Sequence, residues 1–264
     1  MTRPSAEAFP VSDRQPVLFV SHGAPTWALD PVAAADFRAL GAALPRPGAV
    51  LVVSAHWTDA PPALGARQPR DLLYDFHGFP PELYRIRYQA PAAAALADEL
   101  ERQIPGLRRD DDRGWDHGVW VPLMHLFPTA DVPILQVSLP QAWSPVQLFE
   151  FGSALAPLRD QGVLILASGG MVHNLARLAW DGGGGAPQWA TDFESFVRER
   201  LTRGDTDGLL AYRERAPGFA LAHPTDEHFT PLLVAAGAAG SAPVAFPIEG
   251  FDFGSLSRLA VRFG

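Results

Sequence analysis

Three hydrophobic runs of the chain each lead into a histidine. Residues 17–20 lead into Ser21 and His22, residues 51–53 lead into Ser54, Ala55 and His56, and residues 164–167 lead into a short glycine-containing turn that ends at His173. In an open α/β sheet, ligands bind beyond the carboxyl ends of the strands, so three imidazoles placed there can meet at one point. Converging imidazoles usually bind a metal ion. The spacing therefore predicts a metal site at the ends of these strands.

Composition narrows the chemistry of that site. The 264 residues include no cysteine, which excludes disulfides, thiolate catalysis and cysteine ligands and leaves histidine and carboxylate groups. The net charge of −8 and the lack of a basic stripe exclude a nucleic-acid partner. No segment reaches the roughly 20 apolar residues of a membrane span, and the chain does not start with a signal-like pattern. We expect a cytoplasmic protein without a membrane partner.

The elements that must position the histidines alternate between strand and helix patterns, which predicts one α/β domain over residues 1–264 with a central, mostly parallel mixed sheet flanked by helices. Residues 1–15 form a loose lead-in, residues 57–90 a long irregular segment, residues 182–185 a surface loop and residues 250–254 a connecting turn. The predicted strands are 17–21, 49–55, 132–138, 162–168, 243–248 and 256–263. The predicted helices are 32–43, 92–103, 120–127, 145–158, 188–202, 206–214 and 225–238.

A further metal ligand is expected near the start of the last predicted helix. Pro224 and Thr225 are typical of a helix start, with Thr225 as its cap, and Glu227 and His228 follow. Adjacent helical residues point about 100° apart, so one ion is not expected to bind both. The spacing leaves two sets open: His22 and His56 with Glu227, as in non-haem Fe(II) centres, or the same pair with His228.

Other residues could serve the same site. Asp116 precedes His117 and either fixes the tautomer of an imidazole or caps the following helix. The aromatic segment 74–80 is suited to covering a flat apolar ligand. His77 and His125 do not follow a strand, and we assign them to surface or packing roles. The segment around Ser168 lacks the arrangement of a serine-hydrolase nucleophile.

Six motifs, taken in order, resemble the class III extradiol ring-cleavage dioxygenases, specifically the branch that contains the DOPA 4,5-dioxygenases. The resemblance runs from about residue 17 to the end of the chain. The motifs are Ser21-His22-Gly23-Ala24-Pro25, Ser54-Ala55-His56-Trp57, Tyr74-Asp75-Phe76-His77-Gly78-Phe79-Pro80, Trp115-Asp116-His117-Gly118, His173-Asn174-Leu175 and Pro224-Thr225-Asp226-Glu227-His228.

The resemblance implies roles for individual residues. His22, His56 and His228 match metal ligands, and His117 matches a second pocket histidine that contacts substrate. The residue that matches His173 lies close to the metal in the family, as an acid/base or as an additional ligand of bound zinc, and we expect acid/base chemistry with Asn174 orienting the ring. The implied activity is the opening of a catechol by O2, with Fe(II) for activity and Zn(II) as an ion that the same site can bind.

Two other functions use the same histidines. A zinc-dependent hydrolase would activate water, with His173 or Glu227 as the base, and a non-catalytic protein would bind a metal or a small molecule without consuming O2. The expected partners are a small aromatic diol and O2, for a monomer or a small homo-oligomer.

Overall fold

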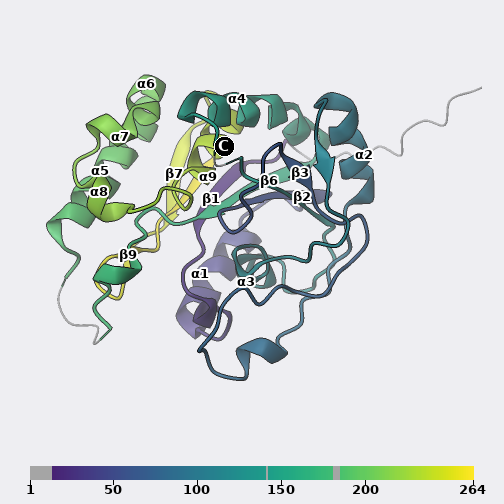
Figure 1. The fold of residues 1–264 in the computed structure, drawn as a ribbon, viewed down its shortest axis with the longest axis horizontal. Helices are drawn as coiled ribbons and strands as arrows, with labels where there is room; N and C mark the ends of the chain where they lie inside the picture. Colours follow the sequence, from purple (N-terminus) through teal and green to yellow (C-terminus); the bar gives the residue numbers. More distant parts are fainter. Residues whose placement is uncertain (1–13, 141, 181–184) are drawn as a thin grey trace, which may run out of the picture.

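The computed structural model describes residues 14–140, 142–180 and 185–264. Its centre is an eight-stranded sheet with the order β4-β3-β5-β2-β6-β1-β10-β7. The core strands β5, β2, β6 and β1 are parallel, whereas β10 and β7 continue the sheet in antiparallel fashion beyond β1. The predicted α/β fold with a mostly parallel mixed sheet is confirmed (Figure 1).

The strands and helices have the following bounds. The strands are β1 (Val17–Ser21), β2 (Ala49–Ser54), β3 (Ala63–Leu64), β4 (Arg108–Arg109), β5 (Ile134–Val137), β6 (Val163–Gly169), β7 (Val244–Ile248), β8 (Phe251–Asp252), β9 (Leu256–Ser257) and β10 (Ala260–Phe263). The α-helices are α1 (Pro31–Ala42), α2 (Ala94–Gln103), α3 (His117–Leu126), α4 (Pro145–Leu155), α5 (Gln188–Arg203), α6 (Thr206–Leu210), α7 (Tyr212–Arg215), α8 (Phe219–Ala222) and α9 (Pro231–Ala239). Short 3-10 turns are η1 (Pro25–Ala28), η2 (Leu83–Arg85), η3 (Ala156–Gln161) and η4 (Leu175–Arg177).

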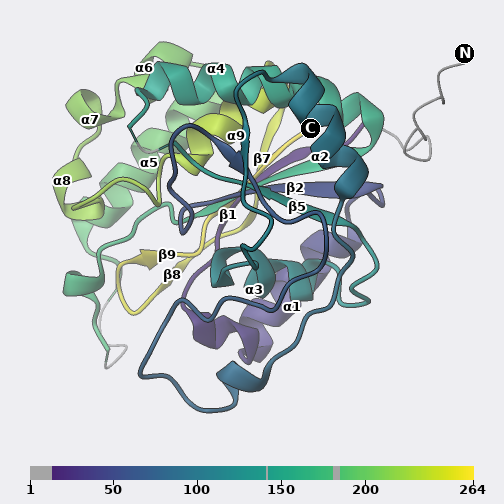
Figure 2. The same ribbon diagram turned by 45° about the vertical axis from the view of Figure 1, so that its right-hand side comes forward.

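Alternate residues of each central strand pack on opposite faces of the sheet. In β1, Val17 and Phe19 belong to one hydrophobic core and Leu18 and Val20 to the other. The first core contains residues of α2, α4, α5 and α9, and the second contains residues of α1 and α3. Figure 2 shows the sheet between α4 and α9 on one side and α1 and α3 on the other. Because both faces are covered, the strands are apolar throughout and direct their polar residues to their ends.

Several predicted boundaries are wrong for identifiable reasons. The last α-helix starts at Pro231 and not at residue 225, because Asp226 accepts hydrogen bonds from the Tyr212 hydroxyl (2.5 Å) and from Arg213 Nε (2.8 Å) instead of lying at a helix start. The predicted cap Thr225 therefore has no helix to cap. The predicted helix 206–214 is interrupted at Ala211, which separates α6 from α7.

Other differences concern short elements. The predicted turn 250–254 contains β8, which pairs with β9, and the predicted strand 256–263 is split into β9 and β10. The long segment 57–90 contains β3 and η2 and is otherwise irregular, as predicted. Most of the predicted lead-in and of the loop 182–185 lies outside the described residues, but Arg14 pairs with Asp160 at 2.9 Å. Among the helices described, none has the length and apolar character needed to cross a bilayer.

Candidate metal centre

Four histidines from four separate parts of the chain converge at the carboxyl edge of the parallel strands. His22 follows β1, His56 follows β2, His117 is the first residue of α3, and His228 lies in the turn before α9. The Nε2 atoms of His22 and His56 are 3.0 Å apart. The ring of His228 lies 5.4 Å from that of His22 and 5.0 Å from that of His56, and the ring of His117 lies 4.1 Å from that of His56. The structure thus places the three expected ligands together and adds His117 to them.

The tautomer of His22 follows from its hydrogen bonds. Its Nδ1 lies 2.9 Å from Ser168 Oγ, and the Ser168 hydroxyl donates its only proton to the carbonyl of Gly118. That carbonyl is free because Pro122, four residues later in α3, has no N–H to donate to it. Nδ1 of His22 must therefore be the donor to Ser168, which leaves the Nε2 lone pair directed at His56.

A single carboxylate faces both His56 and His117. Asp75 Oδ1 accepts hydrogen bonds from His117 Nδ1 (2.8 Å) and from the His117 backbone N–H (3.0 Å), while Asp75 Oδ2 lies 3.3 Å from His56 Nδ1. Neutral imidazoles that direct Nδ1–H at this carboxylate carry their lone pairs on Nε2. His56 therefore presents the same atom to the centre as His22 does.

His228 completes the set, and it too bonds a partner through Nδ1 and leaves Nε2 for the centre. Its Nδ1 lies 2.9 Å from Glu227 Oε1, and its Nε2 is buried without a hydrogen-bond partner among the described residues. Glu227 thus stands behind His228. A buried polar atom without a partner is costly unless a bound group satisfies it.

The ring of His173 stacks on that of His228, with centroids 3.6 Å apart and planes inclined by 6°. His173 therefore lies face to face with an expected metal ligand, at the edge of the centre. The expectation that Asn174 orients His173 is wrong, because its side chain donates to Leu221 O (2.7 Å) and accepts from Ala176 N–H.

Asp116 serves neither of the two roles expected for it. It precedes α3 without a side-chain capping bond, and no imidazole contacts its carboxylate. Instead it accepts hydrogen bonds from Ser54 Oγ (2.7 Å), Gln136 Nε2 (2.6 Å) and Arg113 NH2 (3.2 Å). It is fully buried and links β2, β5 and the start of α3 beneath the histidines.

The centre favours neutral imidazoles. Burial, followed by the neighbouring imidazoles, lowers the pKa of His22 well below its ordinary value and lowers that of His56 to about 2 and that of His173 to about 3. Burial would raise the pKa of Asp75, but the hydrogen bond and charge of His117 and the charge of His56 lower it to about 2. The hydrogen bond from His228 lowers the pKa of Glu227 to about 2 despite burial. At neutral pH, His22, His56 and His173 are therefore neutral nitrogen donors, and Asp75 and Glu227 are ionised.

This donor set fits a divalent metal ion. The Nε2 atoms of His22 and His56 lie 3.0 Å apart, close enough for one ion to bind both. Ligating histidines in metalloproteins usually donate their second N–H to a carboxylate or another acceptor, as His22 and His228 do here, and Nδ1 of His56 lies 3.3 Å from the carboxylate of Asp75. Candidate ligand atoms also come within 4.8 Å of one another in two groups, His22 with His56 and His117, and His173 with Glu227 and His228.

An aromatic wall adjoins the centre on the side of His117. Phe76 lies edge-on to the His117 ring at 5.7 Å. It also packs against Phe79, Tyr84 and Trp120, with ring centroids 5.2 to 6.3 Å apart. The segment 74–80, expected to cover a flat ligand, supplies this wall.

The remaining histidines lie outside the centre. His77 is exposed, and His125 is buried with Nε2 3.1 Å from Trp27 O, in line with the expected surface and packing roles. His223 is buried behind the site with Nε2 2.9 Å from Met171 O. Sequence reasoning missed the partners Asp75 and Ser168, although a serine at the end of each of three strands (Ser21, Ser54, Ser168) was a visible signal.

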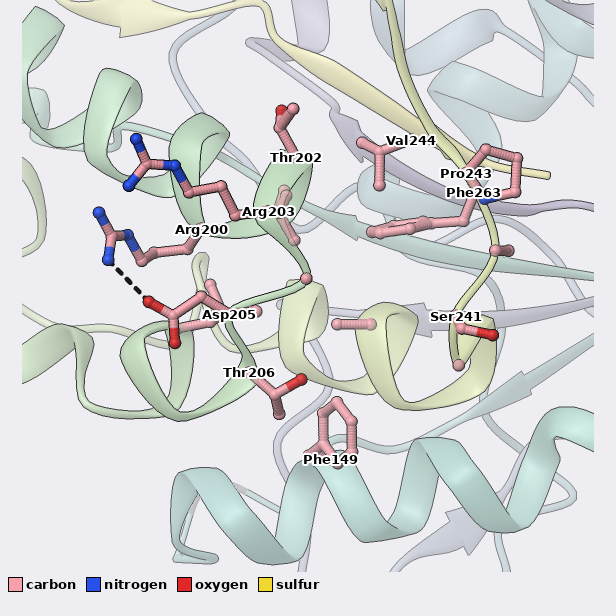
Figure 3. Close-up of a pocket in the computed structure, with 16 residues that line it drawn as sticks. Phe149, Arg200, Thr202, Arg203, Asp205, Thr206, Ser241, Pro243, Val244 and Phe263 are labelled. Atoms are coloured by element: carbon pink, nitrogen blue, oxygen red, sulfur yellow. Dashed lines mark hydrogen bonds and ion pairs between the residues drawn. The ribbon is translucent and has the colours of Figure 1, made fainter.

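A separate pocket of about 280 Å³ lies at the opposite end of the sheet (Figure 3). Phe263 lines it and pairs with Val17 at the start of β1, whereas His22 follows the end of that strand. Arg200 in this pocket pairs with Asp205 and Glu199, each at 2.7 Å. Its charges are thus neutralised within the protein, and it is not part of the histidine centre.

Fold and site together define an α/β scaffold with a candidate histidine metal centre at the strand ends, and the comparisons identify its family. Residues 33–264 match the family model described as the catalytic LigB subunit of aromatic ring-opening dioxygenase, and the chain belongs to this family. It is an extradiol aromatic ring-opening dioxygenase, which confirms the predicted resemblance and class of enzyme.

Curated relatives and a solved structure agree with this assignment. The chain is 40% identical to the 4,5-DOPA dioxygenase extradiol of Escherichia coli K12, over 96% of each chain. It is 38% identical to the protein of the same name from Beta vulgaris, over 93% of this chain and 95% of that one. The crystal structure of the uncharacterized protein JW3007 from Escherichia coli K12 superposes with a TM-score of 0.81 at 37% identity, covering 95% of this chain and 100% of that one.

Proposed function

We propose that the protein opens the ring of a DOPA-like catechol with O2, using Fe(II) held by His22, His56 and His228. The observation that carries this proposal is the buried, unpartnered Nε2 of His228 beside the facing Nε2 atoms of His22 and His56. The curated relatives named 4,5-DOPA dioxygenase extradiol support the choice of substrate class. When bound, the ion would supply one point at which both substrates meet. Zn(II) is the ion we expect to compete for the same nitrogens.

The choice of His228 over His117 as third ligand rests on what each nitrogen lacks. Nε2 of His228 is buried and has no hydrogen-bond partner in the described part of the chain. His117 adjoins Phe76 and the aromatic wall, where a substrate ring would lie, so we assign it to substrate contact. Glu227 is engaged with His228 Nδ1, which supports a role behind the ligand and not as a ligand.

His173 is assigned to proton transfer. Its stacking on His228 keeps it beside the expected metal ligands. Burial, followed by the neighbouring imidazoles, lowers its pKa to about 3, so the ring is neutral at pH 7 and has a nitrogen that can accept a proton, while the low pKa makes it a weaker base than a free imidazole. The negative charge of Glu227 is the nearby feature that favours the protonated ring.

The proposal also covers the domain, the location and the partners of the protein. The catalytic domain spans residues 1–264, the protein is cytoplasmic and a monomer or small homo-oligomer, and its partners are the aromatic diol and O2, with no nucleic acid or membrane. Family membership gives no support to a zinc hydrolase or a non-catalytic metal-binding protein.

The test is anaerobic reconstitution with Fe(II), followed by DOPA, protocatechuate or simpler catechols while O2 uptake and visible absorbance are recorded. We expect O2 uptake with a yellow ring-opened product from DOPA. His22→Ala and His228→Ala should lose the metal, whereas His117→Ala and His173→Ala should keep it and lose most turnover. Loss of metal from His117→Ala with retention in His228→Ala would replace the proposed ligand set, and no uptake with any catechol would refute the function.

A further inference from the structure

The strongest unassigned feature is the aspartate shared by His56 and His117. Asp75 lies in the irregular segment between β3 and η2, so no strand leads directly into it in the sequence. Its side chain is 26% exposed, and its two oxygens divide their contacts, with Oδ1 on His117 and Oδ2 on His56. One residue thus contacts both an expected metal ligand and an expected substrate contact.

We propose that Asp75 is a positioning residue that fixes the tautomers of His56 and His117 together, so that both present Nε2 to the centre. The inference rests on the proposed function in one respect, which is that His56 is taken to be a metal ligand. An ionised Asp75 accepts hydrogen bonds and donates none, so His117 Nδ1, which it bonds at 2.8 Å, carries a proton, and the same is expected of His56 Nδ1, which faces Oδ2 at 3.3 Å. A carboxylate that backs a ligating histidine in this way raises the basicity of the ligand and fixes its orientation.

The contacts of Asp75 make an asparagine substitution more informative than usual. The backbone N–H of His117 is always a donor, and it points at Oδ1 from 3.0 Å. In Asp75→Asn the amide oxygen must therefore occupy the Oδ1 position, which places the NH2 group at the Oδ2 position, 3.3 Å from His56 Nδ1. His56 would then have to accept a hydrogen bond at Nδ1 and carry its proton on Nε2. In that tautomer, Nε2 cannot bind a metal ion.

The Asp75 variants should follow an unusual order of metal affinity. Asp75→Ala leaves space that water can fill, and water can accept from His56 Nδ1, so the productive tautomer survives. Asp75→Asn imposes the wrong tautomer. We expect Asp75→Asn to bind Zn(II) about 10- to 100-fold more weakly than the wild type, and Asp75→Ala to be affected less. A residue needed only for loop structure would give the opposite order, because asparagine has nearly the shape of aspartate.

Two measurements on the purified full-length protein decide the question, and neither depends on catechol chemistry. Histidine side-chain ¹⁵N NMR of the metal-free protein should show His56 protonated at Nδ1 in the wild type and at Nε2 in Asp75→Asn. Zn(II) titration should follow the order wild type, Asp75→Ala, Asp75→Asn from tightest to weakest, with Asp75→Glu close to the wild type because it restores two acceptor oxygens. Asp71→Asn, an exposed aspartate in the same segment, is the matched control and should titrate as the wild type.

The outcomes separate the hypotheses. An Asp75→Asn protein with an unchanged His56 tautomer, or one that binds Zn(II) at least as well as Asp75→Ala, would overturn the positioning role. If Asp75→Asn does not fold, the comparison of Asp75→Glu with Asp75→Ala decides, since equal Zn(II) affinity in those two would also overturn it. Failure of ring opening alone would count against the proposed function and leave the tautomer result intact.

Discussion

At the scale of single residues, the chemistry of this centre depends on the groups behind the imidazoles. Ser168 and Glu227 accept hydrogen bonds from Nδ1 of His22 and His228, and Asp75 lies 3.3 Å from Nδ1 of His56, so that Nε2 of each ring is turned toward a common point. The imidazoles alone would be free to flip or to change tautomer. Their identity was visible in the sequence, but their partners determine which nitrogen is available for a metal ion.

Glu227 gives a prediction that distinguishes a ligand from a partner of a ligand. Glu227→Gln keeps an amide oxygen that can accept from His228 Nδ1, so metal affinity should fall only slightly, whereas Glu227→Ala should lower it about 10-fold. His22→Ala is the reference for loss of a true ligand. The measurement is Zn(II) or Fe(II) titration of the metal-free proteins under anaerobic conditions. If Glu227→Gln loses metal as completely as His22→Ala, Glu227 is itself a ligand and the set of two histidines and one carboxylate is correct.

At the scale of elements, close backbone packing sets the positions of the histidines. Gly169, the last residue of β6, lies against the turn that carries His228, and the next residue, Gly170, donates its N–H to His228 O at 2.9 Å. The helix α3 helps to position His22 through Pro122. Because Pro122 has no N–H, the Gly118 carbonyl is free to accept from Ser168, which contacts His22. The end of β6, the start of α3 and the turn before α9 therefore act as one unit.

Gly169→Ala tests this unit. A Cβ atom at that position would lie 2.1 Å from His228 O, a backbone atom that can move only with the whole turn. We expect the free energy of unfolding to fall by about 1–3 kcal/mol, as for other overpacked positions, and metal affinity to fall with it because His228 is displaced. Gly185→Ala is the control, since a Cβ there would have no atom within 4 Å, and it should change stability by less than about 0.5 kcal/mol. Denaturant unfolding and metal titration check both, and wild-type metal affinity in Gly169→Ala would contradict the coupling.

At the scale of the whole molecule, the elements whose apolar residues follow a regular pattern in the sequence could be predicted. The apolar runs of β1, β2 and β6 indicated a buried parallel sheet, and the site was expected at its carboxyl edge because that is where polar residues follow each run. Asp75 could not be predicted as part of the centre, because it lies in a segment without periodicity that only the folded chain brings to His56. The start of α9 could not be predicted either, because Asp226 bonds to Tyr212 and Arg213 of α7, contacts that form only when the chain between α7 and α9 has folded back.

Burial of neutral histidines predicts how the metal-free protein responds to acid. The pKa of His22 is lowered well below its ordinary value, that of His56 to about 2, that of His173 to about 3 and that of His223 to about 4, in each case chiefly by burial. The unfolded chain binds protons at these residues below a pH of about 6.5, whereas the folded chain does not, so stability falls as the pH falls. From pH 7 to pH 5.5, each histidine should cost about 1.2 kcal/mol, or about 5 kcal/mol for the four.

Urea unfolding of the metal-free protein between pH 7 and pH 5.5 measures this loss. The window lies above the range in which carboxylates titrate in the unfolded chain, so Asp75 and Glu227, whose pKa values are lowered to about 2, add their own loss only at lower pH. His125, whose pKa burial also lowers, adds to the loss in the same window. His173→Asn removes one titrating ring and should reduce the loss by about 1.2 kcal/mol. A free energy of unfolding that stays constant across the window would show that these imidazoles titrate in the folded protein as they do in the unfolded chain. They would then be protonated at pH 5.5, which contradicts a centre of buried, neutral nitrogen donors.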